Sequence, residues 1–151
     1  MSQVIEMIDV DVPVSIAYNQ WTQFESFPNF LSFVRSIEQI GDTLTHWKVR
    51  IAGVEREFDA EITEQLPDER VAWKSLGGDV RHAGVVTFHR LSDASSRVAV
   101  QLDWEAEGIV EKAGALLGID SASVKSDLKK FKEFIEGRGA ETGAWRGSVE
   151  S

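Results

Sequence analysis

The chain has 151 residues and no cysteine, with 42% hydrophobic and 27% charged residues, which suits one domain with its own core and excludes disulfides and sulfur-ligated metals. Its net charge of −9 argues against binding to nucleic acid or to anionic lipid surfaces. We expect a cytoplasmic protein without stable membrane insertion, because neither a signal peptide nor an apolar run of roughly 20 residues is apparent.

The first predicted elements are a strand and two short helices. Residues 3–12 alternate between apolar and polar side chains, which predicts a strand with one covered face. Pro13 ends this strand and suits the first turn of a helix over residues 14–23. Residues 25–34 are rich in phenylalanine and contain Pro28, which favours a second short helix or a turn whose aromatic rings are buried.

Six further segments also alternate between apolar and polar residues, with turn residues between them. We predict strands over residues 35–41, 43–52, 54–65, 69–76, 82–91 and 96–106. Short connections between consecutive strands imply antiparallel hairpins. One apolar and one charged face imply that only one side of the sheet is covered.

Residues 121–138 predict an amphipathic helix that covers this sheet. Val124, Leu128, Phe131 and Ile135 recur at the spacing of one helical stripe. We assign the charged residues of this helix, Asp127 among them, to the solvent side. The apolar stripe needs an apolar partner, and the sheet provides it. A curved sheet closed by one long helix leaves room for a cavity between them.

These elements form one predicted domain over residues 1–138, followed by a polar tail over residues 139–151. We expect the tail to be loosely ordered apart from Trp145. An apolar, glycine-bearing segment over residues 109–119 precedes the last helix. Two interpretations of this segment stay open, namely a mobile gate over the cavity and a tight packing turn.

Short motifs through nearly the whole chain carry a resemblance to a known family. They are Val10-x-x-Pro13, Phe24-x-x-Phe27-Pro28-x-Phe30, Ala72-Trp73-Lys74-Ser75, Gly84-Val85-Val86-Thr87-Phe88, Asp127-Leu128-x-x-Phe131-Lys132 and Gly143-Ala144-Trp145-Arg146-Gly147. In order and spacing they resemble the START-like (SRPBCC) superfamily, and within it the polyketide cyclase/dehydrase and coenzyme Q-binding protein family.

The resemblance implies an α+β helix-grip fold. In this fold a strongly bent antiparallel sheet, of about seven strands here, wraps around a long C-terminal helix, with two short helices after the first strand. It also implies a deep cavity for apolar or aromatic small molecules. The family includes binders and transporters as well as enzymes, so the fold alone does not deliver the function.

The three histidines do not indicate a metal site, because no two share a helical face or close strand positions. His46 and His89 fall on the charged face of their strands and are assigned to the surface. His82 follows a turn. It either reaches the mouth of the cavity or lies in the solvated turn, and we favour the turn.

Arg56, Ser75 and His82 are the candidates for catalysis. Arg56 shares the parity of Phe58, and it either meets the polar end of a ligand or forms a salt bridge at the rim, which we favour. Ser75 offers an inward hydroxyl, but no base is apparent that would make it a nucleophile. The carboxylates between residues 55 and 64 form a row on one exposed face, which is not the arrangement of an acid/base pair.

We therefore expect a binding module that holds a hydrophobic small molecule, such as a lipid, a quinone or a polyketide-like aromatic. Trp47, Trp73 and Trp104 lie on the covered face, where they either pack the core or stack on a planar ligand. The predicted lining residues are Phe30, Trp47, Val49, Ile51, Phe58, Ile62, Trp73, Ser75, Val86, Phe88, Leu102, Leu128, Phe131 and Ile135.

Two other functions stay open. The first is a polyketide cyclase or dehydratase that uses the same cavity, as the family name implies. The second is a protein that binds a partner through its acidic surface and its tail, and a homodimer is also left open. No cofactor, metal or nucleic acid is expected, and the sequence does not identify the ligand.

Overall fold

A computed structural model describes residues 2–51, 54–77, 80–106, 121–145, 147 and 149. Its strands are β1 (Ser2–Val10), β2 (Val34–Gln39), β3 (Leu44–Ile51), β4 (Val54–Leu66), β5 (Arg70–Leu76), β6 (Val80–Ser92) and β7 (Ser95–Ala106). Its helices are α1 (Val14–Trp21), the 3₁₀ helix η1 (Phe24–Asn29) and α2 (Ser121–Arg138). This order confirms the predicted helix-grip fold.

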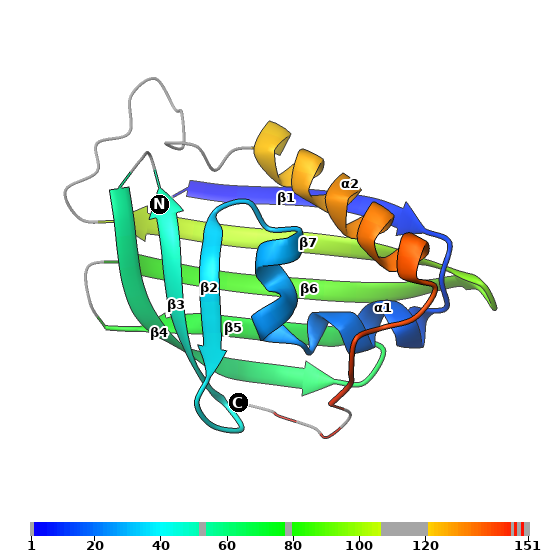
Figure 1. The fold of residues 1–151 in the computed structure, drawn as a ribbon, viewed down its shortest axis with the longest axis horizontal. Coiled ribbons are helices and arrows are strands. Elements are labelled where there is room, and N and C mark those ends of the chain that lie inside the picture. The colour runs from blue at the N-terminus through cyan, green and yellow to red at the C-terminus, as the bar shows by residue number, and fades with distance from the viewer. Residues whose placement is uncertain are drawn as a thin grey trace.

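The strands form one antiparallel seven-stranded sheet in the order β1-β7-β6-β5-β4-β3-β2. Strands β2 to β7 therefore meander, and β1 joins beside β7. Figure 1 shows β2 and β3 crossing at a steep angle in front of β5, β6 and β7, while β4 bends between the two halves of the sheet. The helices lie on the same side, so the concave face of the bent sheet is the covered one.

Helix α2 lies on this concave side and buries the predicted apolar stripe there. Val124, Leu128, Phe131 and Ile135 are each exposed by 1% or less. Phe131 contacts the rings of Trp21 and Phe30, with centroids 5.2 Å and 5.1 Å away. The helix therefore rests on aromatic side chains from α1 and the adjoining loop as well as on β1. None of the helices among the described residues is long and apolar enough to cross a membrane.

One assignment of a polar residue was wrong. Asp127 does not face water, because its side chain is buried and accepts hydrogen bonds from the backbone N–H and the hydroxyl of Ser32, both at 3.0 Å. The described part of the tail makes hydrogen bonds to the domain. The N–H of Thr142 donates to Gln20 Oε1 at 2.9 Å, and the N–H of Trp145 donates to Thr22 Oγ1 at 3.1 Å.

Candidate ligand-binding site

The residues predicted to line a cavity meet on the concave face. Apart from Ile51 and Ser75, all of them belong to one buried cluster: Phe30, Trp47, Val49, Phe58, Ile62, Trp73, Val86, Phe88, Leu102, Leu128, Phe131 and Ile135. Ser75 is half-buried, and the side chain of Ile51 lies outside the described residues. The predicted gate at residues 109–119 lies outside them too. That these residues line a ligand cavity stays a prediction.

Aromatic rings fill the middle of the concave face. Trp47 and Trp73 lie 5.7 Å apart between centroids, and Phe58 stacks on Trp47 at 5.6 Å. From η1, Phe24 and Phe27 each approach Trp73 to 5.7 Å. These edge-on and tilted contacts are the arrangements that aromatic pairs prefer. The rings of η1 therefore cover this part of the sheet.

His82 lies inside the core, and its favoured assignment to a solvated turn was wrong. It is 3% exposed and stacks on Trp104, with ring centroids 3.8 Å apart and planes 18° apart. The rings of Trp47 and Phe58 stand at 5.6 Å and 5.9 Å. The reason is that β6 begins at Val80, where it pairs with Ala106, so His82 is already a strand residue with the inward parity of Gly84.

Both ring nitrogens of His82 are engaged. The indole N–H of Trp73 donates to Nε2 at 2.9 Å, and Nδ1 lies 3.0 Å from the carbonyl oxygen of Asp103. Because Nε2 accepts, the proton is on Nδ1 and points at that carbonyl. Burial lowers the pKa of His82 to about 3, against a smaller opposing effect of the Asp103 carbonyl. This imidazole is therefore neutral at physiological pH and has no nitrogen free to take a proton.

Ser75, the second catalytic candidate, makes a hydrogen bond to the backbone. Its Oγ accepts a hydrogen bond from the N–H of His82 at 2.9 Å. The hydroxyl therefore helps to hold β5 and β6 together at the point where His82 turns inward. Ser75 and His82 are close, but they are not a nucleophile and its base, since neither ring nitrogen of His82 is directed at the serine oxygen.

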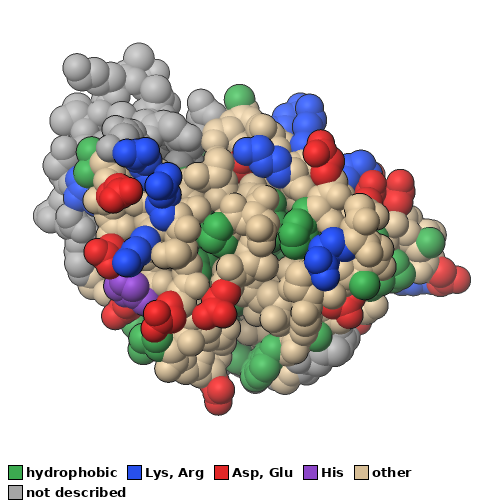
Figure 2. All heavy atoms as spheres, in the orientation of Figure 1, with side chains coloured by type: hydrophobic (Ala, Val, Ile, Leu, Met, Phe, Trp, Pro, Cys, Tyr) green, Lys and Arg blue, Asp and Glu red, His purple; other side chains and the backbone are tan. Residues whose placement is uncertain are grey.

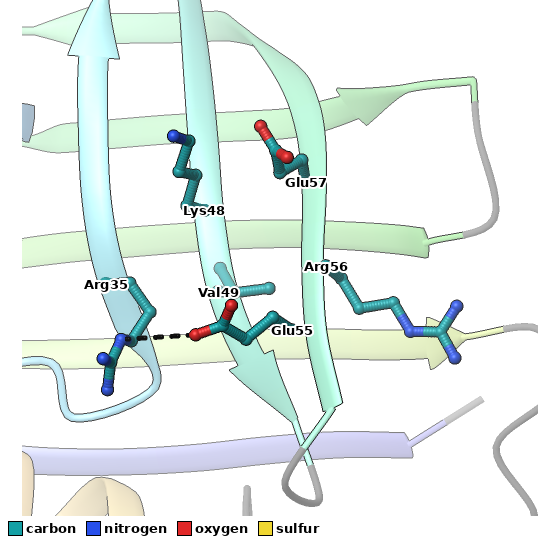
Figure 3. Close-up of a pocket in the computed structure, with 6 residues that line it drawn as sticks. All are labelled: Arg35, Lys48, Val49, Glu55, Arg56 and Glu57. Atoms are coloured by element: carbon teal, nitrogen blue, oxygen red, sulfur yellow. Dashed lines mark ion pairs between the residues drawn. The ribbon is translucent and has the colours of Figure 1, made fainter.

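Arg56, the third candidate, stands at the edge of a pocket of about 200 Å³. The pocket is lined by Arg35, Lys48, Val49, Glu55, Arg56 and Glu57. In Figure 3 the side chain of Arg56 extends away from the ion pair between Arg35 and Glu55, whose nitrogen and oxygen are 4.0 Å apart. The lining is largely charged, so this rim pocket differs in chemistry from the aromatic interior.

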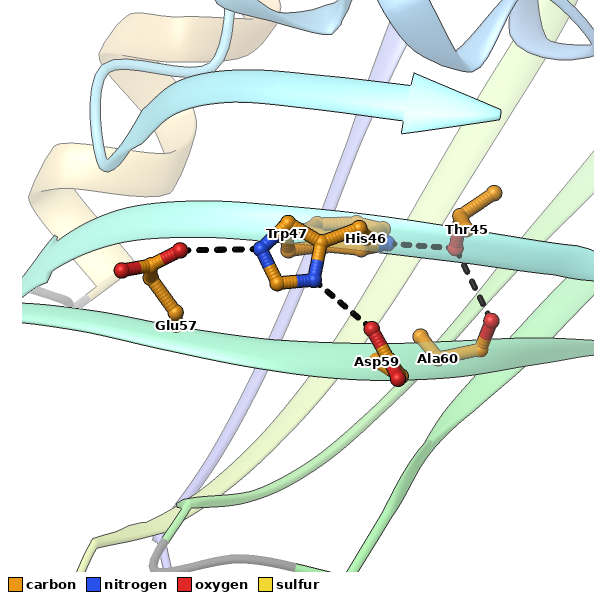
Figure 4. A network of polar contacts seen from close by, with 6 residues as sticks. All are labelled: Thr45, His46, Trp47, Glu57, Asp59 and Ala60. Atoms are coloured by element: carbon orange, nitrogen blue, oxygen red, sulfur yellow. Dashed lines mark hydrogen bonds and ion pairs between the residues drawn. The ribbon is translucent and has the colours of Figure 1, made fainter. Parts of the chain in front are cut away.

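The outer face of β3 and β4 carries a polar network around His46. Its Nδ1 lies 2.7 Å from Asp59 and its Nε2 lies 2.9 Å from Glu57 (Figure 4). Hydrogen bonds to these carboxylates raise the pKa of His46, with the bond to Asp59 the larger cause. Figure 2 shows acidic and basic side chains intermixed over this face. The carboxylate row and His89 are exposed as predicted, apart from the half-buried Glu61 and Glu64.

In the part of the chain that the structure describes, no three His, Asp or Glu side chains are arranged so that they could hold a metal ion.

The polar partners of the tryptophans are the features that sequence reasoning missed. The indole N–H of Trp47 donates to Thr45 Oγ1 at 2.7 Å, and that hydroxyl donates to the carbonyl of Ala60 at 2.9 Å (Figure 4). Thr45 lies on the same inward face of its strand as Trp47, and this parity was the sequence signal that could have indicated the hydrogen bond.

A family model described as polyketide cyclase / dehydrase and lipid transport matches residues 10–133. The chain belongs to this family. A protein of Streptomyces lincolnensis, described as an uncharacterized 17.2 kDa protein, is 58% identical over 149 residues, which cover 99% of both chains. The description of that relative therefore names no activity.

Solved structures share the fold. A START superfamily protein from Mycobacterium smegmatis has a TM-score of 0.70 at 15% identity and covers 90% of this chain and 95% of its own. The Zhui aromatase/cyclase from Streptomyces sp. R1128 has a TM-score of 0.63 at 13% identity, with 91% and 92% covered. At such identities the likeness shows the helix-grip, START-like fold and nothing about the reaction.

Proposed function

We propose that this protein binds a hydrophobic small molecule, such as a lipid, a quinone or a polyketide-like aromatic, between its sheet and α2, and that it does so in the cytoplasm. The observation that carries the proposal is the concave face, where His82 is neutral and tryptophan and phenylalanine rings surround it. The rings around His82 are uncharged, so a ligand that inserts among them meets apolar area and ring faces.

Burial supplies the affinity in this proposal. An apolar ligand that buries about 300 Å² gains roughly 7 kcal/mol at ~25 cal/mol/Å², before the costs of association. The family description, which names lipid transport beside two enzymatic activities, is compatible with a protein that only binds and releases.

Native mass spectrometry of freshly purified protein is the first test. We expect a co-purified small molecule that is lost on partial unfolding. The second measurement is a thermal shift with a panel of fatty acids, quinones and polycyclic aromatics, read together with tryptophan fluorescence. If no molecule co-purifies and no member of the panel changes either the melting temperature or the fluorescence, the proposal fails.

A cyclase or dehydratase is the second candidate, and it is favoured by the family description, which names these activities. The occupied nitrogens of His82 count against it, since general acid/base catalysis needs a group that can exchange a proton with the substrate. The matched variants are Ser75→Ala and His82→Gln, with Arg56→Gln at the rim. If the wild-type protein turns over a poly-β-ketone chain and none of the three variants slows it, these residues are not catalytic.

A further inference from the structure

Three tryptophans of the concave face differ in what their indole N–H groups meet. Trp47 donates to Thr45 at 2.7 Å and Trp73 donates to His82 at 2.9 Å. Trp104 is only 4% exposed, yet its Nε1 has no hydrogen-bond partner in the part of the chain that the structure describes. A buried donor without an acceptor has lost its water and gained nothing in return, which is rare in native proteins.

The surroundings of Trp104 indicate what the missing acceptor is. Its ring stacks on the neutral imidazole of His82, with Phe33 perpendicular at 5.2 Å and Phe58 at 6.3 Å. All of its ring partners are uncharged at neutral pH, and His82 already uses both nitrogens. A carboxylate or phosphate buried here would lack a counter-charge among these rings, whereas a neutral oxygen needs only one donor.

We propose that the indole N–H of Trp104 donates a hydrogen bond to an uncharged oxygen, a carbonyl or an ether, of the bound apolar ligand. This inference rests on the proposed function, and it narrows the expected ligands to apolar molecules that carry such an oxygen. Trp104 then distinguishes oxygen-bearing ligands from hydrocarbons of the same shape. A site that provides one buried donor favours the ligand that satisfies it.

A second unpartnered indole provides the internal control. Trp21 is fully buried, and its Nε1 also has no partner among the described residues. It differs in its ring contacts, which among the described residues are with Phe27, Phe30 and Phe131 at 5.1–5.2 Å, whereas Trp104 stacks on His82. The proposal therefore predicts ligand discrimination by Trp104 and not by Trp21.

The experiment uses two pairs of probes that differ by one carbonyl, namely fluorenone with fluorene and benzophenone with diphenylmethane. Dissociation constants are measured by tryptophan fluorescence for the full-length wild type, Trp104→Phe and Trp21→Phe. We expect Trp104→Phe to bind each ketone about fivefold to tenfold more weakly, after division by its change in affinity for the matched hydrocarbon. Trp21→Phe should leave this ratio unchanged.

Loss of ring volume is separated from loss of the donor by a second variant. Replacement of Trp104 by benzothienylalanine puts sulfur in place of the N–H and keeps the shape of the ring. This variant should show the same loss of ketone preference while its melting temperature stays within about a degree of the wild type. The rival role for the N–H is donation to the face of Phe33. That role predicts a lower melting temperature in the unliganded isostere and no change in ketone preference.

The outcomes separate this inference from the proposed function. If the wild type binds the hydrocarbons and ketones but the isostere keeps the ketone preference, the role of Trp104 is wrong and apolar binding stands. The same holds if the Trp21 variant loses the preference instead. If the wild type binds neither pair, the inference about Trp104 fails, and apolar-ligand binding fails with it when nothing co-purifies and the panel of fatty acids, quinones and polycyclic aromatics also gives no response.

Discussion

His82 shows how the environment of a residue decides its chemistry. Burial holds its pKa at about 3, while the carboxylates of Glu57 and Asp59 raise that of His46 on the outer face. We predict that in a pH titration by NMR the imidazole of His82 shows no transition between pH 8 and pH 5, and that His46 titrates above its ordinary value. A His82 midpoint near that ordinary value would contradict its burial.

The low pKa of His82 in the folded chain makes the free energy of unfolding depend on pH. Below the ordinary histidine pKa of about 6.5 the unfolded chain binds a proton at His82, whereas the folded chain does so only near pH 3. Stability is therefore lost as the pH falls through this window, by up to about 1.4 kcal/mol per pH unit. His82→Gln keeps a donor and an acceptor without this titration, so urea unfolding should show a flatter pH dependence. An unchanged slope would be evidence against this linkage.

Strand parity predicted most of the residues that meet on the concave face, while the assignments of His82 and Asp127 failed for different reasons. His82 opens the predicted strand over residues 82–91 with the parity of Gly84, but the glycine-rich turn before it favoured a solvated side chain. Asp127 stands three residues after Val124 and four before Phe131, which places it on the buried stripe. Its partner Ser32 is 95 residues away, and residue type alone could not indicate that bond.

At the scale of elements, the pairing of β5 with β6 depends on a glycine under a tryptophan. Gly84 faces Trp73 in the register, and a Cβ at this position would overlap the Trp73 indole, coming within 2.9 Å of Nε1. We predict that Gly84→Ala lowers the free energy of unfolding by about 1–3 kcal/mol, because the ring must leave its place against His82. Chemical unfolding followed by tryptophan fluorescence measures this.

Gly137 provides the matched control for Gly84. It lies on the exposed side of the last turn of α2, and a Cβ there would have no neighbour within 4 Å. Gly137→Ala should raise the free energy of unfolding by about 0.5–1 kcal/mol, because alanine loses less backbone entropy in a helix. If the two substitutions have equal effects, steric overlap with Trp73 is not what fixes Gly84.

Asp127 joins α2 to the loop before β2. Burial raises the pKa of Asp127, and the two hydrogen bonds from Ser32 oppose that effect. We predict that Asp127→Ala costs about 1–3 kcal/mol, because it leaves both Ser32 donors without their acceptor. Asp127→Asn retains one acceptor oxygen and no buried charge, so it should cost clearly less. Thermal unfolding of the two variants checks this order, and an equal loss would show that the charge itself matters.

For the whole molecule, the amphipathic helix and the alternating strands predicted the architecture, but nothing in the local pattern predicted the course of the tail. It forms pairs of hydrogen bonds with residues more than 80 positions away. Thr142 pairs with Gln20, and Val149 forms an isolated antiparallel bridge with Gln65. The buried side chain of Gln20 needs a polar partner, whereas the bridge of Gln65 joins the two backbones, and a sequence pattern displays neither contact.

We expect the described residues of the tail to contribute to the stability of the domain through these contacts. A variant that ends at Gly139 loses both hydrogen bonds between Thr142 and Gln20 and the bridge to Gln65. We predict a loss of about 1–3 kcal/mol in the free energy of unfolding, without a change in the far-ultraviolet circular dichroism of the sheet.

A double-mutant cycle tests whether Gln20 carries this coupling. In full-length protein, Gln20→Ala removes the partner of Thr142, so truncation in the Gln20→Ala background should cost less than truncation of the wild type. The cycle is measured by urea unfolding of the four proteins. Equal costs in both backgrounds would show that the tail acts elsewhere, through the Gln65 bridge or through Trp145, whose N–H donates to Thr22. Thr22→Val, which removes the acceptor of the Trp145 N–H, would then distinguish that contact from the bridge between Gln65 and Val149, whose hydrogen bonds join the two backbones.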